Sequence, residues 1–194
     1  MQLWCVSGGF CVAVDQEIIY LMKDAMEYRV DHEGKIISLI ENLGIIIDIP
    51  PGAIPDHHPD EVIIRINACI RGPFVLPDGY ELVTPVFQIE PGAKFADKPV
   101  ELSMVHFLNI KDESHCSELN FVSAPYKPNS NIKKESIEFK LLDGGKFRPG
   151  SRIGRIALQH FCLIGIVKQK DCKQSTMAGE ASSTMRPAIP SKSM

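Results

Sequence analysis

The stretch Ile49-Pro50-Pro51-Gly52-Ala53-Ile54-Pro55 is the most informative part of this sequence. An aliphatic run that begins at Ile45 leads into two prolines, and the proline ring fixes φ at about −65°. Gly52 then permits a turn that a β-branched residue would not tolerate. The stretch therefore predicts the end of one β-strand and the start of the next in a fixed direction.

Short strands are predicted on both sides of this turn. From Val62 to Ile70 apolar and polar side chains alternate, which is the period of two of a half-buried antiparallel strand. Upstream, a hairpin and meander with glycine-bearing turns is predicted from the runs Tyr28 to Val30, Lys35 to Ile40 and Ile45 to Ile49. Downstream, the predicted strands are Val86 to Ile89, Val100 to Phe107, Leu119 to Ser123, Ile137 to Leu142 and Gly154 to Val167.

Proline and glycine separate these runs. Most of the 14 prolines fall between predicted strands, where proline belongs because it cannot donate to a sheet ladder. Many short strands with regular turn signals, and no alternation of helices with strands, indicate an all-β fold. We predict an antiparallel β-sandwich with a short N-terminal extension and a disordered C-terminal tail.

The 194 residues divide into three parts on these patterns. Residues 1–26 stay unassigned, although Ile18, Ile19, Met22 and Met26 have a spacing compatible with a short helix. Residues 27–167 carry the predicted sandwich. Residues 168–194 have no hydrophobic periodicity and are rich in Ser, Thr, Lys and Met, which predicts a disordered basic tail.

Charge and composition exclude several classes of protein. The net charge is −3, made of +3 on residues 168–194 and −6 on the rest, so general nucleic-acid binding is not predicted. No apolar run is long enough to span a membrane, and the N-terminus lacks the positive region of a signal peptide. The six cysteines show no C-x-x-C spacing, which favours free thiols in a reducing compartment. We expect a cytoplasmic location.

The motif at residues 49–55 strongly resembles the core motif of the ZU-five domain. That module is shared by zona occludens proteins, netrin receptors of the uncoordinated type, ankyrins and the p53-induced death-domain protein. The resemblance continues in Leu82 to Pro91, which includes Pro85, Val86 and Pro91, and in a segment with Phe95, Pro99, Val100 and His106. Val105 stands where the family usually has proline, and Phe161 to Gly165 is similar to the closing strand.

The resemblance implies a non-enzymatic β-sandwich that binds proteins and needs no cofactor. In ankyrins the module is similar to a spectrin-binding unit, and in the netrin receptors it packs against neighbouring domains and restrains a death domain. The implied setting is a cytoplasmic signalling or membrane–cytoskeleton scaffold of animals, with cytoskeletal or death-domain proteins as partners. Only 27 residues follow the last predicted strand, which leaves no room for those companion domains. The chain is therefore expected to be a single module or a fragment of a larger netrin-receptor-like, ankyrin-like or death-domain protein.

An alternative function is self-cleavage at the Phe161-Cys162 bond. Some members of the resembled family cleave themselves within His-Phe-Ser, and this chain has His160-Phe161-Cys162. In this reading Cys162 attacks the preceding carbonyl and His160 moves the proton, which requires both side chains on one face of a strand. The opposing interpretation is a core strand in which cysteine serves as a small hydrophobic residue.

No metal or phosphate site is predicted. Asp56-His57-His58-Pro59-Asp60 contains zinc-type ligands, but adjacent residues rarely face one ion and a solvated loop explains them better. The combinations His115-Cys116 and His106 with Cys69 are equally weak. The segment Asp143 to Gly150 has glycines and cations but does not match the P-loop pattern, so we interpret it as a loop between two strands.

Overall fold

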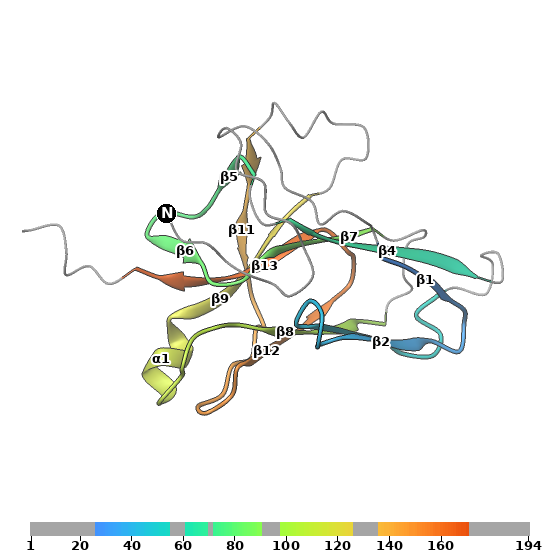
Figure 1. Cartoon of the computed structure of the whole chain (residues 1–194), viewed down its shortest axis with the longest axis horizontal. Helices are drawn as coiled ribbons and strands as arrows, with labels where there is room; N and C mark the ends of the chain where they lie inside the picture. Colours follow the sequence, from blue (N-terminus) through green and yellow to red (C-terminus); the bar gives the residue numbers. More distant parts are fainter. Residues whose placement is uncertain (1–25, 55–60, 70–71, 91–97, 126–135, 171–194) are drawn as a thin grey trace, which may run out of the picture.

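Two antiparallel β-sheets face each other across a shared core in the computed structural model (Figure 1). The structure describes residues 26–54, 61–69, 72–90, 98–125 and 136–170. The two antiparallel sheets packed on one core confirm the predicted all-β antiparallel sandwich. Residues 1–25, with most of the weakly predicted helix, and most of the predicted tail lie outside the described residues.

The larger sheet has seven strands and the smaller has four. The larger sheet runs in the order β1 (Met26–Val30), β4 (Val62–Cys69), β7 (Val86–Glu90), β13 (Leu163–Gln169), β9 (Leu119–Ala124) and β11 (Lys140–Leu142), and β6 (Tyr80–Leu82) also pairs with β13. The smaller sheet runs in the order β12 (Ile153–Leu158), β8 (Val100–Val105), β3 (Ile45–Ile49) and β2 (Lys35–Leu39). A five-residue helix, α1 (Glu113–Ser117), precedes β9.

The main core lies between these sheets and follows the alternation of the sequence. In β3, Ile45, Ile47 and Ile49 are buried while Asp48 is exposed. In β4, Val62, Ile64 and Ile66 face inward in the same way. Because side chains on a strand alternate between its faces, these two strands supply opposite walls of one core.

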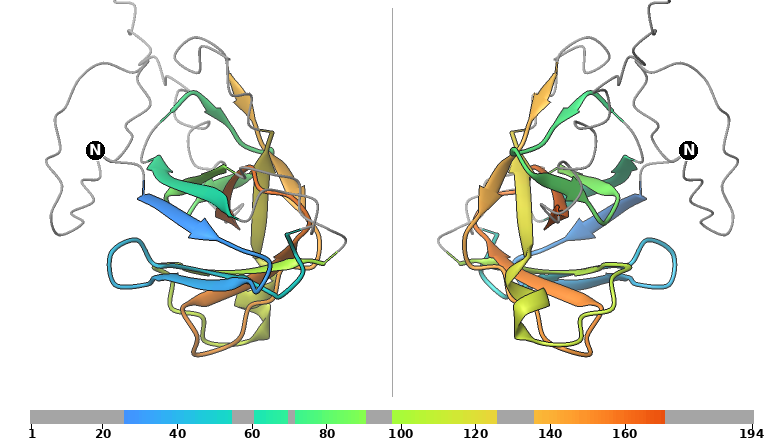
Figure 2. Two further views of the ribbon diagram at one scale, coloured as in Figure 1. Left: turned by 90° about the vertical axis from the view of Figure 1, so that its right-hand side faces the viewer. Right: turned by 90° about the vertical axis from the view of Figure 1, so that its left-hand side faces the viewer.

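A second core lies on the other face of the larger sheet. A two-stranded parallel ribbon, β5 (Phe74–Val75) with β10 (Ile137–Glu138), covers this face (Figure 2). The buried residues of this second core are Cys69, Val86, Val122, Ala124, Phe139, Leu163 and Val167. The four residues Val86–Ile89 and the five residues Leu163–Val167 are buried without alternation because both faces of their sheet are covered here.

Three predictions about the strands need correction. The run predicted as one strand from Gly154 to Val167 forms β12 in the smaller sheet and β13 in the larger sheet, with a bend at residues 159–160. The run Ile137 to Leu142 splits at Phe139 into β10 and β11, which belong to different sheets. The predicted meander is also wrong at its start, because β1 pairs with β4 and only β2 and β3 form a hairpin.

The first and last described strands reach slightly beyond residues 27–167, in which the strands were expected. Strand β1 begins at Met26 and β13 ends at Gln169. The short strands β5 and β6 and helix α1 were not predicted, because segments of two to five residues carry no measurable periodicity. None of the helical residues that the structure describes forms a helix long and apolar enough to cross a membrane.

Candidate functional site

The turn at residues 49–55 has a structural role. Gly52 has φ +74°, and its amide N–H donates to the carbonyl oxygen of His32 at 2.8 Å. Ala53 and Ile54 are buried in the main core, whereas Pro51 is exposed and its carbonyl oxygen accepts from Lys98 Nζ at 2.6 Å. The turn thus ends β3 and ties it to the β1–β2 connection. Ile49 is buried, Pro50 is half-buried, and Pro55 lies outside the described residues.

The segment around Pro85 and Val86 joins β6 to β7 along one partner strand. The Thr84 hydroxyl accepts from the buried Ile166 amide N–H at 2.9 Å, and the Val83 amide N–H donates to the Ile166 carbonyl oxygen at 2.9 Å. Thr84 therefore replaces a ladder hydrogen bond at the point where β6 ends and β7 begins. Val86 is fully buried, which gives this part of the resembled motif a packing role.

Of the third predicted segment, only part is described. Pro91 and Phe95 lie outside the described residues, Pro99 is exposed before β8, and Val100 is fully buried. His106 follows β8 and is completely buried, with its ring 6.0 Å from that of Phe147. Neither ring nitrogen makes a hydrogen bond of good geometry with the residues that the structure describes.

The environment of His106 favours the neutral ring. Burial lowers the pKa of His106 below its ordinary value, the backbone of Leu108 acts in the opposite direction, and the positive charge of Arg152 adds to the lowering. A buried imidazole without a well-formed hydrogen bond costs free energy, so this residue stands out among the buried side chains.

His160, Phe161 and Cys162 do not have the arrangement that self-cleavage requires. His160 is exposed in the bend after β12, whereas Phe161 and Cys162 are buried in the main core before β13 begins. The carbonyl oxygen of Cys162 accepts from the Ile89 amide N–H at 3.2 Å. The prediction that His160 and Cys162 share one strand face is therefore wrong, because neither residue lies in a strand.

The Cys162 thiol is also a weak nucleophile in this environment. Burial raises its pKa to about 11, and a hydrogen bond with Ser123 opposes that rise only in part. Since the thiolate is the reactive form, a thiol with this pKa is almost entirely protonated at neutral pH. Burial likewise raises the pKa of Cys69 to about 12. Cys69, Cys116 and Cys162 are free thiols.

The weakly considered metal combinations gain no support from the geometry. Asp56, His57, His58 and Asp60 lie outside the described residues. His115 Nδ1 lies 2.7 Å from Asp112 Oδ1 at the start of α1, an exposed pair that caps the helix. No group of three or more His, Cys, Asp or Glu side chains suited to a metal ion occurs in the parts of the chain that the structure describes.

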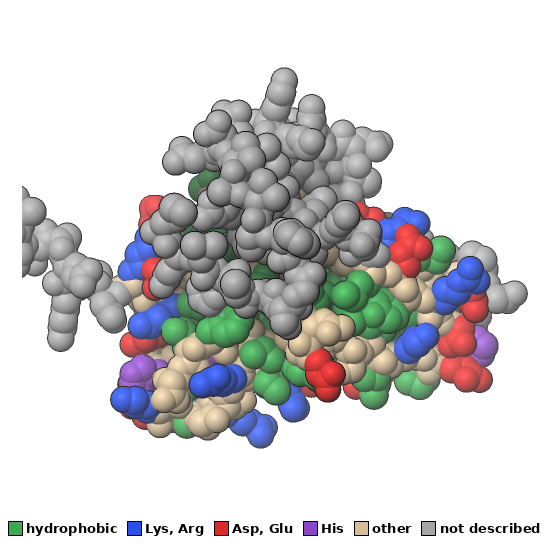
Figure 3. All heavy atoms as spheres, viewed as in Figure 1, with side chains coloured by type: hydrophobic (Ala, Val, Ile, Leu, Met, Phe, Trp, Pro, Cys, Tyr) green, Lys and Arg blue, Asp and Glu red, His purple; other side chains and the backbone are tan. Residues whose placement is uncertain are grey.

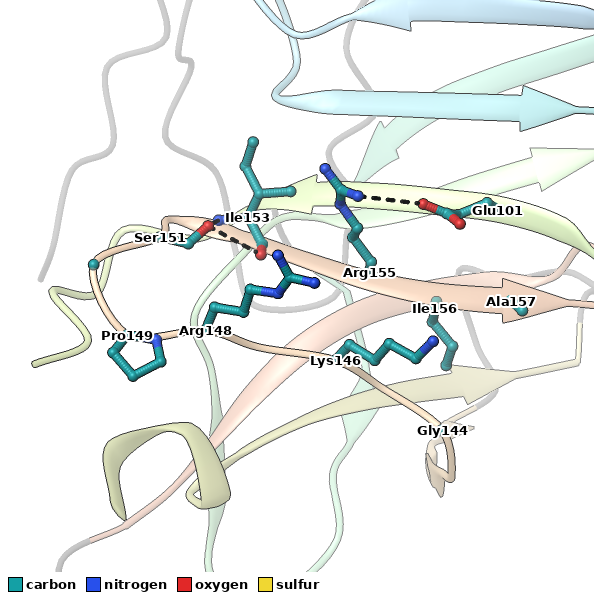
Figure 4. Close-up of a pocket in the computed structure, with 11 residues that line it drawn as sticks. Glu101, Gly144, Lys146, Arg148, Pro149, Ser151, Ile153, Arg155, Ile156 and Ala157 are labelled. Carbon is teal, nitrogen blue, oxygen red and sulfur yellow. Dashed lines mark hydrogen bonds and ion pairs between the residues drawn. The ribbon is translucent and has the colours of Figure 1, made fainter. Parts of the chain in front are cut away.

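A pocket of about 490 Å³ lies beside β12, where the loop after β11 folds back along the sheet edge (Figure 4). Lys146 and Arg148 extend from the loop toward β12, and Arg155 and Glu101 lie on β12 and β8. Arg155 Nη1 is 3.8 Å from Glu101 Oε1, and both side chains are more than half exposed. The pocket therefore holds three cations and one carboxylate.

Sequence patterns indicated only part of this pocket. The segment Asp143 to Gly150, with its glycines and cations, forms the predicted loop between two strands. The alternation Lys146-Phe147-Arg148 was the available signal for a strand-like segment with two cations on one face. The contribution of Arg155 was not predictable because it depends on how the loop pairs with β12.

The charges elsewhere on the surface are of both signs. Figure 3 shows hydrophobic side chains across the middle of one face, with positive and negative side chains near both ends. Exposed ion pairs join Arg29 to Glu61 and Arg65 to Glu27 on the outer side of β1 and β4. The pocket beside β12 differs from these places because two of its three cations have no acidic partner among the described residues.

The comparison with protein families identifies residues 26–120, which match the model of the ZU5 domain. The matched segment runs from β1 to the start of β9. A search of curated proteins gave no match to this chain.

Proposed function

The chain belongs to the ZU5 domain family through residues 26–120, and on that premise we propose that it is a non-enzymatic protein–protein interaction module. We place it in cytoplasmic signalling or in scaffolds between membrane and cytoskeleton, with cytoskeletal or death-domain proteins as partners. The family match is the observation that carries this proposal.

The outer face of the smaller sheet supports an interaction role. Cross-strand pairs align Ile36 with Asp48 and Ser38 with Ile46, so aliphatic and polar side chains alternate along this face. Ile36 is 65% exposed, which is unusual for an isoleucine on a strand. A surface that mixes exposed aliphatic groups with polar groups is the composition expected of a non-obligate interface.

The proposal is tested by isolating a partner and rebuilding the complex from purified components. The tagged full chain is crosslinked in extract from cells that express it, and captured proteins are identified by mass spectrometry. Each candidate is then purified and mixed with the chain, and the complex is measured by size-exclusion chromatography with light scattering. We expect at least one stoichiometric complex. If no purified candidate forms one, the proposal is wrong.

Two substitutions locate the contact. Ile36→Asp places a charge on the bare face of the smaller sheet, and Ile63→Asp places the same charge on an exposed isoleucine of the larger sheet. A partner that uses the smaller sheet loses affinity for Ile36→Asp and keeps it for Ile63→Asp. Equal affinities for both variants would move the interface away from this face.

Self-cleavage at Phe161-Cys162 is the second hypothesis, and the local geometry does not support it. A buried thiol with a raised pKa and an exposed histidine outside the strand do not form a nucleophile–base pair. Full-length protein incubated at neutral pH should remain a single band on a denaturing gel. A fragment ending at Phe161 that disappears in Cys162→Ala would establish cleavage.

A further inference from the structure

We propose that the pocket beside β12 is the docking site for an acidic segment of a partner protein, bound by Lys146, Arg148 and Arg155. This proposal rests on the proposed function and adds to it a location and a partner chemistry. The pocket joins one face of the smaller sheet to the loop at residues 143–152, so it lies within the surface already assigned to interaction.

The first argument is the placement of like charges. The Lys146 amide N–H donates to the Arg155 carbonyl oxygen at 2.7 Å, and the Arg155 amide N–H donates to the Lys146 carbonyl oxygen at 2.9 Å. Two residues that exchange both bonds form an antiparallel pair, and their side chains leave the same face. Like charges directly opposite each other are destabilising. An anion between Lys146 and Arg155 would remove that repulsion.

The second argument is the surplus of positive charge. Arg148 follows Lys146 by two residues, and both exposed side chains line the same pocket. Glu101 is the one carboxylate among the residues that line the pocket, and its contact with Arg155 is long and exposed. Three cations and one carboxylate leave a local charge of +2, on a protein whose residues 1–167 sum to −6.

The third argument is that the loop is held in place. The Phe147 ring stacks on Phe121 with ring centroids 5.4 Å apart, and a Cβ at Gly154 would lie 2.4 Å from the Phe147 ring. The Gly150 amide N–H donates to the Ile110 carbonyl oxygen at 2.8 Å. Lys146 and Arg148 therefore project from a fixed backbone, which reduces the entropy lost when a ligand binds.

The chemistry of the site favours an acidic peptide over other anions. The negative sum over residues 1–167 repels nucleic acid and anionic membrane surfaces at long range, whereas a peptide with a few carboxylates responds mainly to the local charge. Ile153 and Ala157 beside the cations offer contacts to aliphatic side chains. Ala157, two residues beyond Arg155, directs its backbone N–H and C=O to the same strand edge and can bond a peptide backbone.

The experiment measures fluorescence anisotropy of a labelled peptide that alternates glutamate with valine, titrated with the full chain. A second peptide has glutamine in place of glutamate. We expect the glutamine peptide to bind at least about tenfold more weakly, and Lys146→Glu with Arg148→Glu to weaken binding of the glutamate peptide by a similar factor. Binding should also weaken with added salt.

The matched control changes the same net charge elsewhere. Lys111→Glu with Lys140→Glu replaces two exposed lysines that do not line the pocket, and should change the Kd by less than about threefold. Glu101→Gln removes the carboxylate of the pocket and should tighten binding by about two- to threefold. A gain of affinity cannot come from a misfolded variant. Circular dichroism confirms the fold of each variant.

The outcomes that would overturn the docking site are distinct from failure of the proposed function. Equal Kd values for the two peptides, or equal losses in the two double variants, would overturn it. So would tighter binding of duplex DNA or of phosphatidylserine vesicles that the Lys146→Glu, Arg148→Glu variant abolishes. A purified partner that binds this variant as tightly as the unchanged chain would overturn the docking site and leave the proposed function standing. Absence of any partner would overturn the proposed function itself.

Discussion

The two main sheets differ in what lies on their outer faces. The smaller sheet is open to solvent there, and Ile36, Asp48, Glu101 and Arg155 project from it. The larger sheet is covered over β7, β13 and β9 by the β5–β10 ribbon and its own small core. The proposed function separates binding from stability between the two sheets. Substitutions on the open face should change binding, and those under the ribbon should change the free energy of unfolding.

Strand β4 shows the boundary between the open and the covered surface within one element. Its first part alternates, with Val62 and Ile64 buried and Ile63 and Arg65 exposed. Its last two residues, Ala68 and Cys69, are both buried, because Cys69 belongs to the core under the ribbon while Ala68 belongs to the main core. The β5–β10 ribbon therefore covers β4 only near Cys69, and the outer side of β1 remains exposed to solvent.

The largest effect is expected for Phe139→Ala. Phe139 is buried under the ribbon, and its ring packs edge to face on Phe74 with centroids 5.5 Å apart. Removing a buried phenyl ring leaves a cavity, which should lower the free energy of unfolding by about 3–4 kcal/mol. Urea denaturation followed by circular dichroism measures it. Phe139→Leu, which fills most of the space, should cost much less; an equal cost would contradict the packing role.

A smaller loss is expected for Thr84→Val at the junction of β6 and β7. The substitution keeps the shape but removes the acceptor of the buried Ile166 amide N–H. An unpaired buried donor costs about 1–3 kcal/mol, and we expect a loss of about 2 kcal/mol in the same denaturation measurement. Thr84→Ser keeps the hydroxyl and serves as the control. Similar stabilities of the valine variant and the unchanged chain would show that water replaces the bond.

A pH-dependent effect is expected at His106, the buried residue that follows β8. Its pKa in the folded protein lies below the value of 6.5 that applies to the unfolded chain. At pH values between these two pKa values the unfolded chain binds a proton that the folded protein does not bind. The free energy of unfolding therefore falls as the pH drops through 6.5 and levels off below the pKa of the folded protein. The loss from one group is at most about 1.4 kcal/mol per pH unit.

Variants separate His106 from the other titrating groups. Thermal unfolding of the unchanged chain and of His106→Leu is recorded at several pH values, and the leucine variant should show a flatter decline in Tm. His32→Leu, at an exposed position in the β1–β2 turn, should keep the decline of the unchanged chain. The same slope in all three proteins would exclude His106 as the source.

The smallest effect on stability is expected on the open face. Ile36 is 65% exposed, so Ile36→Thr keeps a β-branched side chain and removes few contacts. The free energy of unfolding should change by less than about 0.5 kcal/mol. A loss comparable to that of Phe139→Ala would mean that this face is covered in the isolated chain and would end the contrast between the sheets.

The same contrast explains which strands the sequence allowed us to predict. Alternation is readable in β3 and the first part of β4 because one face is buried and the other is open. The mostly apolar sequence of residues 154–167 concealed a change of sheet, since Gln159 and His160 form the bend without glycine or proline. The turn at residues 49–55 was predictable because Pro50, Pro51 and Gly52 restrict the backbone locally.

The candidate pocket was less predictable than the fold. Lys146 and Arg148 are visible as a local pattern, but their position opposite Arg155 depends on a backbone pairing over nine residues. The burial of His106 was equally hidden, because no local pattern distinguishes it from the half-buried His115. Both features depend on contacts between segments that are distant in the sequence, which local patterns do not reveal.

The central position of β13 has a consequence for how the chain is made. This strand lies between β7 and β9 and also bonds β6, yet it is among the last described residues to leave the ribosome. Strands β7 and β9 therefore cannot pair with their common neighbour until about forty further residues have been synthesised after β9. Closing this loop costs conformational entropy. The segment matched by the family model, residues 26–120, ends before that strand and does not include the centre of its own sheet. Completion of the larger sheet is thus a late event, reached only when the end of the sandwich has been translated.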